Sequence, residues 1–282
     1  MAIHKAKIIT IASVTGGTGK TTTALNLAGT YSEMKKKTLI LDFDLFSGGI
    51  ALSLNIDINA DLYKLAYDMS VNEYKNIDDY ILKYNDYIDI IPAPKDPRYA
   101  SKIETKYITT ILKKVTPKYD IIIVDTNHFL DATNLILFDK SDTIMYIINN
   151  SPLDIKNIKS MIAIHKDMEK ENYCIVLNES NKKLNEMFTN YDIKNIIKND
   201  IDYIIPRTFY NKNINRYVLN GKIMILEKNI KLLNKKTVNT FNKIALDLLE
   251  RWYYGQKKIH RRIWIENRTR SRRTNRLRNI SE

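Results

Sequence analysis

The stretch "SVTGGTGKTTTALNLA", residues 13–28, decides how the rest of this 282-residue chain is interpreted. It continues the apolar run "AKIITIASV" (6–14) and places three of the chain's eight glycines within four residues. Glycine permits a tight turn and a close approach of the backbone to a ligand. Lys20-Thr21-Thr22 then opens a helical pattern. A strand, a glycine turn and a helix in this order are the context in which a phosphate-binding loop forms.

The residue types in this loop indicate a phosphate group and Mg²⁺ as ligands. Backbone N–H groups and the positive end of the helix dipole would face phosphate oxygens, and Lys20, expected as an exposed charge, would neutralise phosphate charge. The Thr21 hydroxyl would ligate magnesium. The expected nucleotide-binding residues are Thr15, Gly16, Gly17, Thr18, Gly19, Lys20, Thr21 and Thr22. Val14 occupies the first glycine position of the common pattern G-x-x-x-x-G-K-[ST], so a glycine turn that serves only packing is the alternative.

Short apolar strands alternate with helical periodicity along the chain, which predicts an α/β fold with a mostly parallel central sheet and helices on both faces. The expected strands are 6–14, 38–44, 87–93, 119–126, 142–149, 172–179 and 202–206. The expected helices are 21–34, 103–115, 153–170 and a long one from 228 toward 252. The chain divides into a P-loop ATPase domain (1–250) and a basic tail (251–282).

Carboxylates end two of the expected strands. Asp42 and Asp44 lie at the carboxyl end of 38–44, the edge at which open parallel sheets bind ligands. Their alternative role is strand-end solubility or helix capping. Asp125 ends the run "IIIV", where a carboxylate is costly without a partner, and magnesium-bound water would be that partner.

Several segments, taken in order, resemble the ParA/MinD family of P-loop ATPases. "VTGGTGKTT" is similar to its deviant loop x-K-G-G-x-G-K-[ST], and the likeness extends over about residues 6–250. The other similar segments are "LILDFDLFSGGIALSLNI" (39–56), "YDIIIVDT" (119–126), "IVLNES" (175–180) and "IPRTFYNKNINRYVLNGKIMILE" (205–227). "DFDLFSGGIALSLNID" and "IIPAPKDPRYASKIE" look most like the CpaE/TadZ pilus-assembly branch.

The resemblance implies a role for individual residues. Asp42 would help to hold the magnesium shell, and Asp44 would position or deprotonate the attacking water, so that Asp44 and Lys20 are the expected catalytic residues. The metal ligands would be Thr21, Asp42 and Asp125. Asn178 would read the adenine edge, although an isolated Asn also commonly serves a turn.

The chain departs from the family at two places. The lysine that relatives extend across a nucleotide-sandwich dimer is replaced by Thr15, and the segment "TNHF" after Asp125 lacks the usual Pro-rich or glycine turn. Loss of a charge directed at the transferred phosphoryl group costs a factor on the order of 10³ or more. ATP binding is therefore expected, whereas for hydrolysis both a slow and a silent ATPase stay open as alternatives.

Composition excludes several classes of protein. The single cysteine, Cys174, rules out a disulfide framework and favours a reducing compartment. No apolar run approaches the ~20 residues that span a bilayer. "HKAKIITIASV" imitates a signal peptide, but a glycine loop and a helix follow it. His128 and His165 have no neighbours at metal-ligand spacing.

The end of the chain is strongly basic. Residues 251–282 hold eleven Lys or Arg and two Glu, which is +9 of the chain's net +13. Trp252, Ile259 and Ile263 share one helical face with Trp264 beside it, and Gly255 weakens the helix. This basic amphipathic to disordered tail suits an anionic membrane surface, nucleic acid, or a solubilising or partner-binding role.

These features predict a cytoplasmic, homodimeric nucleotide switch that positions a pilus or secretion system, with peripheral contact at the inner face of the membrane. The first alternative is a DNA-partitioning ATPase that binds DNA through its tail and works with a partition partner. The second is a non-hydrolysing, ATP-dependent scaffold.

Overall fold

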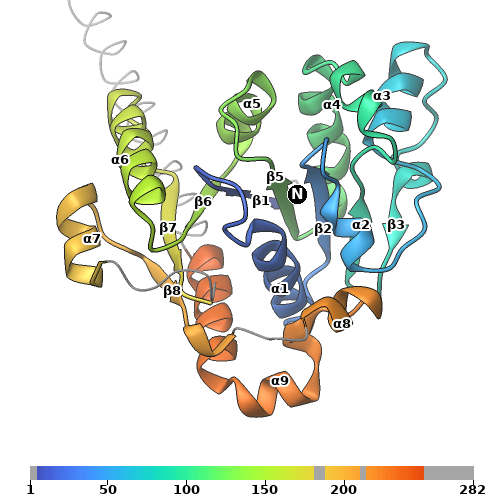
Figure 1. Ribbon diagram of the computed structural model, residues 1–282. Coiled ribbons are helices and arrows are strands. Elements are labelled where there is room, and N and C mark those ends of the chain that lie inside the picture. The colour runs from blue at the N-terminus through green and yellow to red at the C-terminus, as the bar shows by residue number, and fades with distance from the viewer. Residues whose placement is uncertain (1–4, 181–187, 210–213, 251–282) are drawn as a thin grey trace, which may run out of the picture. The chain divides into compact units, whose positions relative to one another are not determined.

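The described residues of the computed structural model, 5–180, 188–209 and 214–250, contain one eight-stranded sheet in the order β3-β4-β2-β5-β1-β6-β7-β8 (Figure 1). All neighbouring strands run parallel except β3, which pairs antiparallel with β4. The strands are β1 Lys7–Ala12, β2 Thr38–Phe43, β3 Leu82–Lys83, β4 Ile88–Ile91, β5 Ile121–Thr126, β6 Thr143–Ile148, β7 Tyr173–Asn178 and β8 Tyr203–Ile205. The predicted α/β fold is confirmed.

The central strands are apolar on both sides because helices cover both faces of the sheet. Every residue of β1, β2, β5 and β6 is buried. The α-helices in this part of the chain are α1 Lys20–Glu33, α2 Gly49–Ser53, α3 Leu62–Ser70, α4 Lys106–Val115, α5 Ala132–Lys140, α6 Pro152–Asp167, α7 Asn190–Ile197, α8 Ile214–Leu219, α9 Lys228–Leu233 and a further helix over 235–250.

Alternate strand residues point to opposite faces, so each strand supplies two cores. The even-numbered residues of β5 and β6 pack against α3, α4, α5, α6 and α7. Helix α1 packs near β1, β2 and β5 (Figure 1). Asp42 in β2 and Asp125 in β5 alternate along their strands with residues of this core, so both point to the opposite face of the sheet. They are also register partners and therefore lie side by side on that face.

All seven predicted strands are present, and β3 is the one that the pattern did not predict. The predicted helix 103–115 begins later, at Lys106, because the 3₁₀ turn Pro97–Lys102 is followed by an extended Ile103. The long helix expected from 228 is interrupted at Asn234, which has a non-helical backbone between α9 and 235–250.

Residues 1–245 form one compact unit and 246–282 a second, so each is described by itself. The predicted tail (251–282) lies outside the described residues and remains a prediction. Within the part of the chain that the structure describes, every helix falls short of the length and apolar character that a bilayer span requires.

Candidate nucleotide site

The glycine loop connects the end of β1, Ala12, to the first residue of α1, Lys20. Gly17 and Gly19 have φ values of 72° and 95°, which L-residues with side chains rarely adopt. A Cβ atom on Gly19 would lie 2.6 Å from the side-chain nitrogen of Asn178, whereas one on Gly17 would meet nothing within 4 Å. Position 19 therefore requires glycine for two independent reasons, and the loop is open beside Gly17.

The side chain of Lys20 is held by a hydrogen bond to a residue at the start of the glycine loop. Its Nζ donates to the Ser13 hydroxyl at 2.9 Å, and that hydroxyl donates to the Thr15 carbonyl at 2.6 Å. The side chain is buried, so the expectation of an exposed charge is wrong, because the loop folds back over its own lysine. Burial lowers the pKa of Lys20, and the nearby Asp125 and Asp44 carboxylates oppose that shift.

The predicted metal-binding carboxylates converge at the carboxyl edge of two neighbouring strands. Asp42 and Asp125 are register partners in the parallel pair β2·β5, and both are fully buried. Asp42 accepts hydrogen bonds from the backbone N–H of Ile50 at 3.0 Å and of Asp44 at 3.2 Å. Asp125 Oδ2 accepts from the Thr21 hydroxyl at 2.6 Å, and its Oδ1 is buried with no partner among the described residues.

Burial raises the pKa of both carboxyl groups. For Asp42 the next cause is the charge of Asp125, and for Asp125 the Thr21 hydrogen bond and Lys20 partly offset the effect of burial. Asp44, half-buried, adds a third carboxylate. Asp44 and Asp125 lie near the Lys20 ammonium group and Asp42 lies beside Asp125, so carboxyl groups outnumber the ammonium group in this place.

These residues fit Mg²⁺ bound together with a nucleotide. The orphaned Asp125 Oδ1 and the Thr21 hydroxyl are hard oxygen atoms, and Mg²⁺ usually takes one or two carboxylates with phosphate and water as its other ligands. In keeping with this, no group of three or more His, Cys, Asp or Glu side chains within the described ranges is arranged to hold a metal by itself. The buried Thr18 hydroxyl also lacks a partner in this part of the chain.

Thr15 is hydrogen-bonded to the N-terminal end of helix α6. Its hydroxyl donates a short hydrogen bond to the carboxylate of Asp154, which is buried in the first turn of α6. The other oxygen of Asp154 accepts from the backbone N–H of Asn149 at 2.7 Å. The position where relatives carry lysine is therefore occupied by a neutral group already engaged within the protein.

Asn178 lies at the end of β7, beside the loop. Its amide nitrogen donates to the Thr18 carbonyl at 2.7 Å, and its oxygen accepts from the Ser180 backbone N–H and hydroxyl. These contacts brace the glycine loop. The adenine-reading role of Asn178 stays a prediction, since both ends of the amide are engaged with protein groups here.

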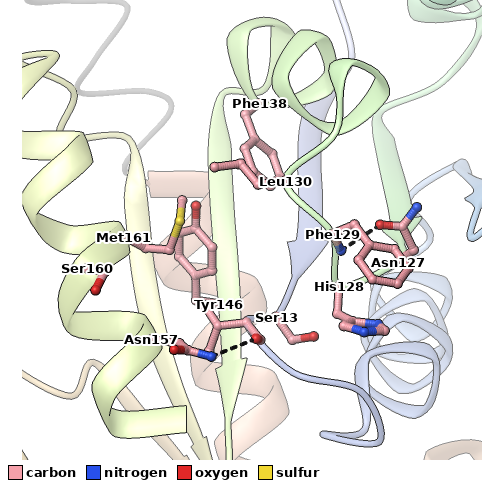
Figure 2. A pocket seen from close by; sticks show the side chains of 11 residues that line it. Ser13, Asn127, His128, Phe129, Leu130, Phe138, Tyr146, Asn157, Ser160 and Met161 are labelled. Carbon is pink, nitrogen blue, oxygen red and sulfur yellow. Dashed lines mark hydrogen bonds between the residues drawn. The ribbon is translucent and has the colours of Figure 1, made fainter. Parts of the chain in front are cut away.

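A cavity of about 220 Å³ opens next to the loop, between α6 and the segment that follows β5 (Figure 2). Leu130, Phe138 and Met161 line it together with Tyr146. Phe129, 60% exposed, and His128 belong to the same segment. His128 extends toward the glycine loop, whereas Leu130 and Phe138 lie at the upper side of the cavity (Figure 2).

The structure brings the loop residues Thr15–Thr22 together with Asp42, Asp44, Asp125 and Asn178, and the roles of these residues in binding and catalysis stay predictions. It adds three residues that sequence patterns did not single out: Ser13, which holds Lys20; Asp154, which holds Thr15; and Asn26, which donates to the Thr22 carbonyl at 2.7 Å. Only the Ser-x-x-Asp helix-capping pattern at 151–154 offered a signal, and it indicated a cap rather than a loop contact.

A protein-family model described as an AAA domain matches residues 6–177, more than half of the chain. The chain belongs to this family. This AAA-domain chain is 29% identical over 197 residues, 65% of its length, to the uncharacterized protein MJECL24 of Methanocaldococcus jannaschii. It spans between 50% and 73% of the length of three curated relatives that it matches, all from that organism.

Solved structures share the fold of the AAA-domain chain. A ParA family ATPase from Chlorobium tepidum has a TM-score of 0.72 at 20% identity, covering 85% of this chain and 98% of that one. The septum site-determining protein MinD from Pyrococcus horikoshii, complexed with Mg-ADP, has a TM-score of 0.70 at 22% identity, covering 86% and 96%. The predicted ParA/MinD fold is thus confirmed, and the CpaE/TadZ branch stays a prediction.

Proposed function

We propose that this ParA/MinD-type protein binds ATP with Mg²⁺ and uses the bound state to form a homodimer that marks the position of a cellular assembly. The observation that carries the proposal is the meeting of Lys20 and Thr21 with Asp42 and Asp125 at one edge of the sheet, with one carboxylate oxygen left unpaired. Burial of these charged groups without a ligand lowers the stability of the folded protein, and binding of a magnesium-bound polyphosphate would offset that cost.

Each residue has a defined task in this proposal. Lys20 binds phosphate oxygens, and Thr21, Asp42 and Asp125 hold the metal or its water shell. Bound Mg²⁺ supplies neutralisation of phosphate charge. Asp44 orients the attacking water, and its half-buried place after β2 leaves it accessible to solvent. Because Thr15 supplies no charge, turnover is slow.

Exposed apolar side chains support self-association through the same edge. Phe46 follows β2, Phe129 follows β5 and Leu153 begins α6, and these side chains are 61%, 60% and 57% exposed. Large apolar groups in water favour burial against a second protein surface. All three follow the carboxyl ends of strands, which places them around the nucleotide site.

The assembly that we propose as the target is a pilus or secretion system, on the likeness of residues 42–57 and 90–104 to the CpaE/TadZ branch. The protein would act in the cytoplasm, with its tail at the inner face of the membrane. A DNA-partitioning ATPase and a non-hydrolysing ATP-dependent scaffold are the alternatives. Genes for pilins and a secretion ATPase beside this gene support the first role, and a gene for a centromere-binding partner supports partition.

Lys20→Ala tests nucleotide binding. We expect ATP affinity to fall on the order of 100-fold, because a charge-assisted contact to phosphate is lost. Isothermal titration calorimetry with Mg-ATP measures the affinity, and light scattering measures the dimer. Lys166→Ala, which changes an exposed lysine in the last turn of α6, is the control and should bind ATP like the wild type. Equal affinity of wild type and Lys20→Ala would refute the proposal.

The tail separates the membrane and DNA alternatives. Serine at Trp252, Ile259, Ile263 and Trp264 should abolish sedimentation with anionic liposomes, since only lipid buries these side chains, at ~25 cal/mol per Å². DNA binding should persist with an unchanged salt dependence, because that slope counts neutralised phosphates. Deletion of 268–282 should weaken DNA binding more than liposome binding. A wild-type protein that ignores liposomes at low salt would contradict the membrane role.

A further inference from the structure

His128 occupies the border of the glycine loop. A Cβ atom built on Gly16 would lie 3.7 Å from both Cε1 and Nδ1 of the imidazole, so the ring is in ordinary contact range of the loop. His128 also lines the cavity, and Figure 2 shows its ring on the side of the glycine loop, apart from Leu130 and Phe138. The side chain is exposed, so its ring remains accessible from the open side of the loop.

The segment that carries His128 is fastened on both sides. Asn127, itself buried, accepts hydrogen bonds from the Phe129 backbone N–H and the Asn134 amide, each at 2.8 Å. Asp131 caps α5 by accepting from the Asn134 N–H at 2.8 Å. A short, internally bonded turn thus presents His128, which lies three residues after Asp125, the carboxylate that contacts Thr21.

Two side-chain donors of the loop region, Thr15 and Lys20, already donate to other protein groups. Thr15 gives its hydroxyl to Asp154, and Lys20 donates to Ser13 from a buried position. Asp42, Asp44 and Asp125 contribute negative charge on the β2·β5 side. A terminal phosphate beside these carboxylates needs a further donor, and an imidazole N–H that borders Gly16 is placed to provide one.

We propose that His128 is a phosphate-binding residue that donates a hydrogen bond from its ring to the terminal phosphate of the nucleoside triphosphate bound in the same chain. The inference rests on the proposed nucleotide-binding function. It predicts that His128 increases the affinity for a nucleoside triphosphate more than the affinity for a diphosphate. The reason is that the turn after Asp125 lies on the side of the loop where the proposed magnesium ligands converge.

The test compares His128→Phe, which keeps a planar ring without a donor, with His128→Arg, which keeps a donor. Calorimetry with Mg-AMPPNP should show affinity about tenfold weaker for His128→Phe and within about twofold of wild type for His128→Arg. Mg-ADP affinity should change less than about twofold for both. Leu135→Ala, at an exposed position of α5, is the control for an unspecific effect on this region and should match the wild type.

A second measurement uses the unmodified protein. The ¹⁵N signals of the His128 ring, assigned from the loss of those signals in His128→Phe or His128→Arg, should shift on addition of Mg-AMPPNP and stay in place with Mg-ADP. Absence of that shift, or equal weakening of both nucleotides in His128→Phe, overturns the inference. If His128→Phe binds like the wild type while Lys20→Ala loses both nucleotides, the inference fails and the proposed function stands. A wild-type protein that binds neither nucleotide removes both.

Discussion

Two neighbouring rows of side chains on the same face of the sheet have equal burial and opposite chemistry. In the first row, Ile123 of β5 is in register with Ile9 of β1 and Ile40 of β2. Two residues further along each strand, Asp125 is in register with Ile11 and Asp42. All six side chains have 0% exposure. Burial by itself therefore does not distinguish the core of this protein from its candidate site.

The two rows differ in whether their side chains have all the interaction partners that they need. The isoleucines are satisfied by apolar contact, whereas Asp125 retains an unpaired oxygen and a raised pKa. The isoleucine row contributes stability through removal of apolar area from water. The aspartate row costs stability in the ligand-free protein, and in the proposed function a bound cation would offset that cost. Substitutions in the two rows should accordingly have opposite consequences.

Ile123→Ala should give the largest change in stability. Truncation of a fully buried isoleucine costs about 3 kcal/mol from lost apolar transfer and the cavity left behind, which is roughly 6 to 12 °C in Tm for a domain of this size. Calorimetric melting measures it, and Mg-ATP affinity at 25 °C should stay within about twofold of the wild type. A large loss of affinity with little change in Tm would show that the two rows are not functionally distinct.

Asp125→Asn should act in the opposite direction in the metal-free protein. It removes a buried charge while keeping an acceptor for the Thr21 hydroxyl, so we expect about 1 kcal/mol more stability at pH 8, roughly 2 to 4 °C in Tm. The same change should weaken Mg-ATP binding, because an amide is a poorer magnesium ligand than a carboxylate.

The stability gain should depend on pH with a definite sign. The folded protein has a raised Asp125 pKa, so the favourable contribution of the protonated carboxyl is present below the ordinary Asp pKa and is lost as the pH rises through the folded-state pKa. The advantage of Asp125→Asn should therefore shrink between pH 8 and pH 5. Melting of wild type and variant across this range, without Mg²⁺ and in one salt concentration, checks it, and an advantage that grows toward pH 5 would contradict the assignment.

Thr15→Lys should have the smallest effect on stability and a measurable effect on activity. The new ammonium can pair with Asp154, but position 15 is half-buried, so the change in unfolding free energy should be below about 1 kcal/mol. Phosphate release should rise, or the ATP-bound dimer should become more stable, because relatives carry a lysine here. Thr15→Gln, which adds length without charge, is the control. Wild-type turnover that already equals that of Thr15→Lys would show that position 15 does not limit the reaction.

The strands could be predicted because a parallel sheet covered on both faces requires continuous apolar runs, such as "IIIV" before Asp125. Strand β3 could not, since two residues, Leu82 and Lys83, carry no periodicity. Helices α3, α5 and α7 were missed although Asp61, Asp131 and Thr189 cap them, and those capping residues were the available signal. Short helices stabilised by tertiary contact leave a weak pattern in the sequence.

The carboxylates of the site were predictable from one rule, that parallel strands present their carboxyl ends at one edge. The contacts that set the shape of the loop were not. Thr15 and Asp154 are 139 residues apart, and Thr18 and Asn178 are 160 apart, so their meeting depends on the strand order. The burial of Lys20 arises from the path of the loop backbone, which residue types alone do not specify.

The glycine loop and helix α1 are completed by residues from 178 onward. Asn178 supports the Thr18 carbonyl, and in α1 the side chain of Asn26 accepts a hydrogen bond from the Ile225 backbone N–H at 2.9 Å. Gly29 admits Ile223 and Ile225 so closely that a Cβ would lie 2.8 Å from each of them. During synthesis from the N-terminus, the phosphate loop therefore emerges long before the residues that brace it. On the ribosome, the loop residues proposed to bind the nucleotide are synthesised early, but the residues that hold them in position are synthesised late. We therefore expect the growing chain to bind nucleotide only when the domain is nearly complete.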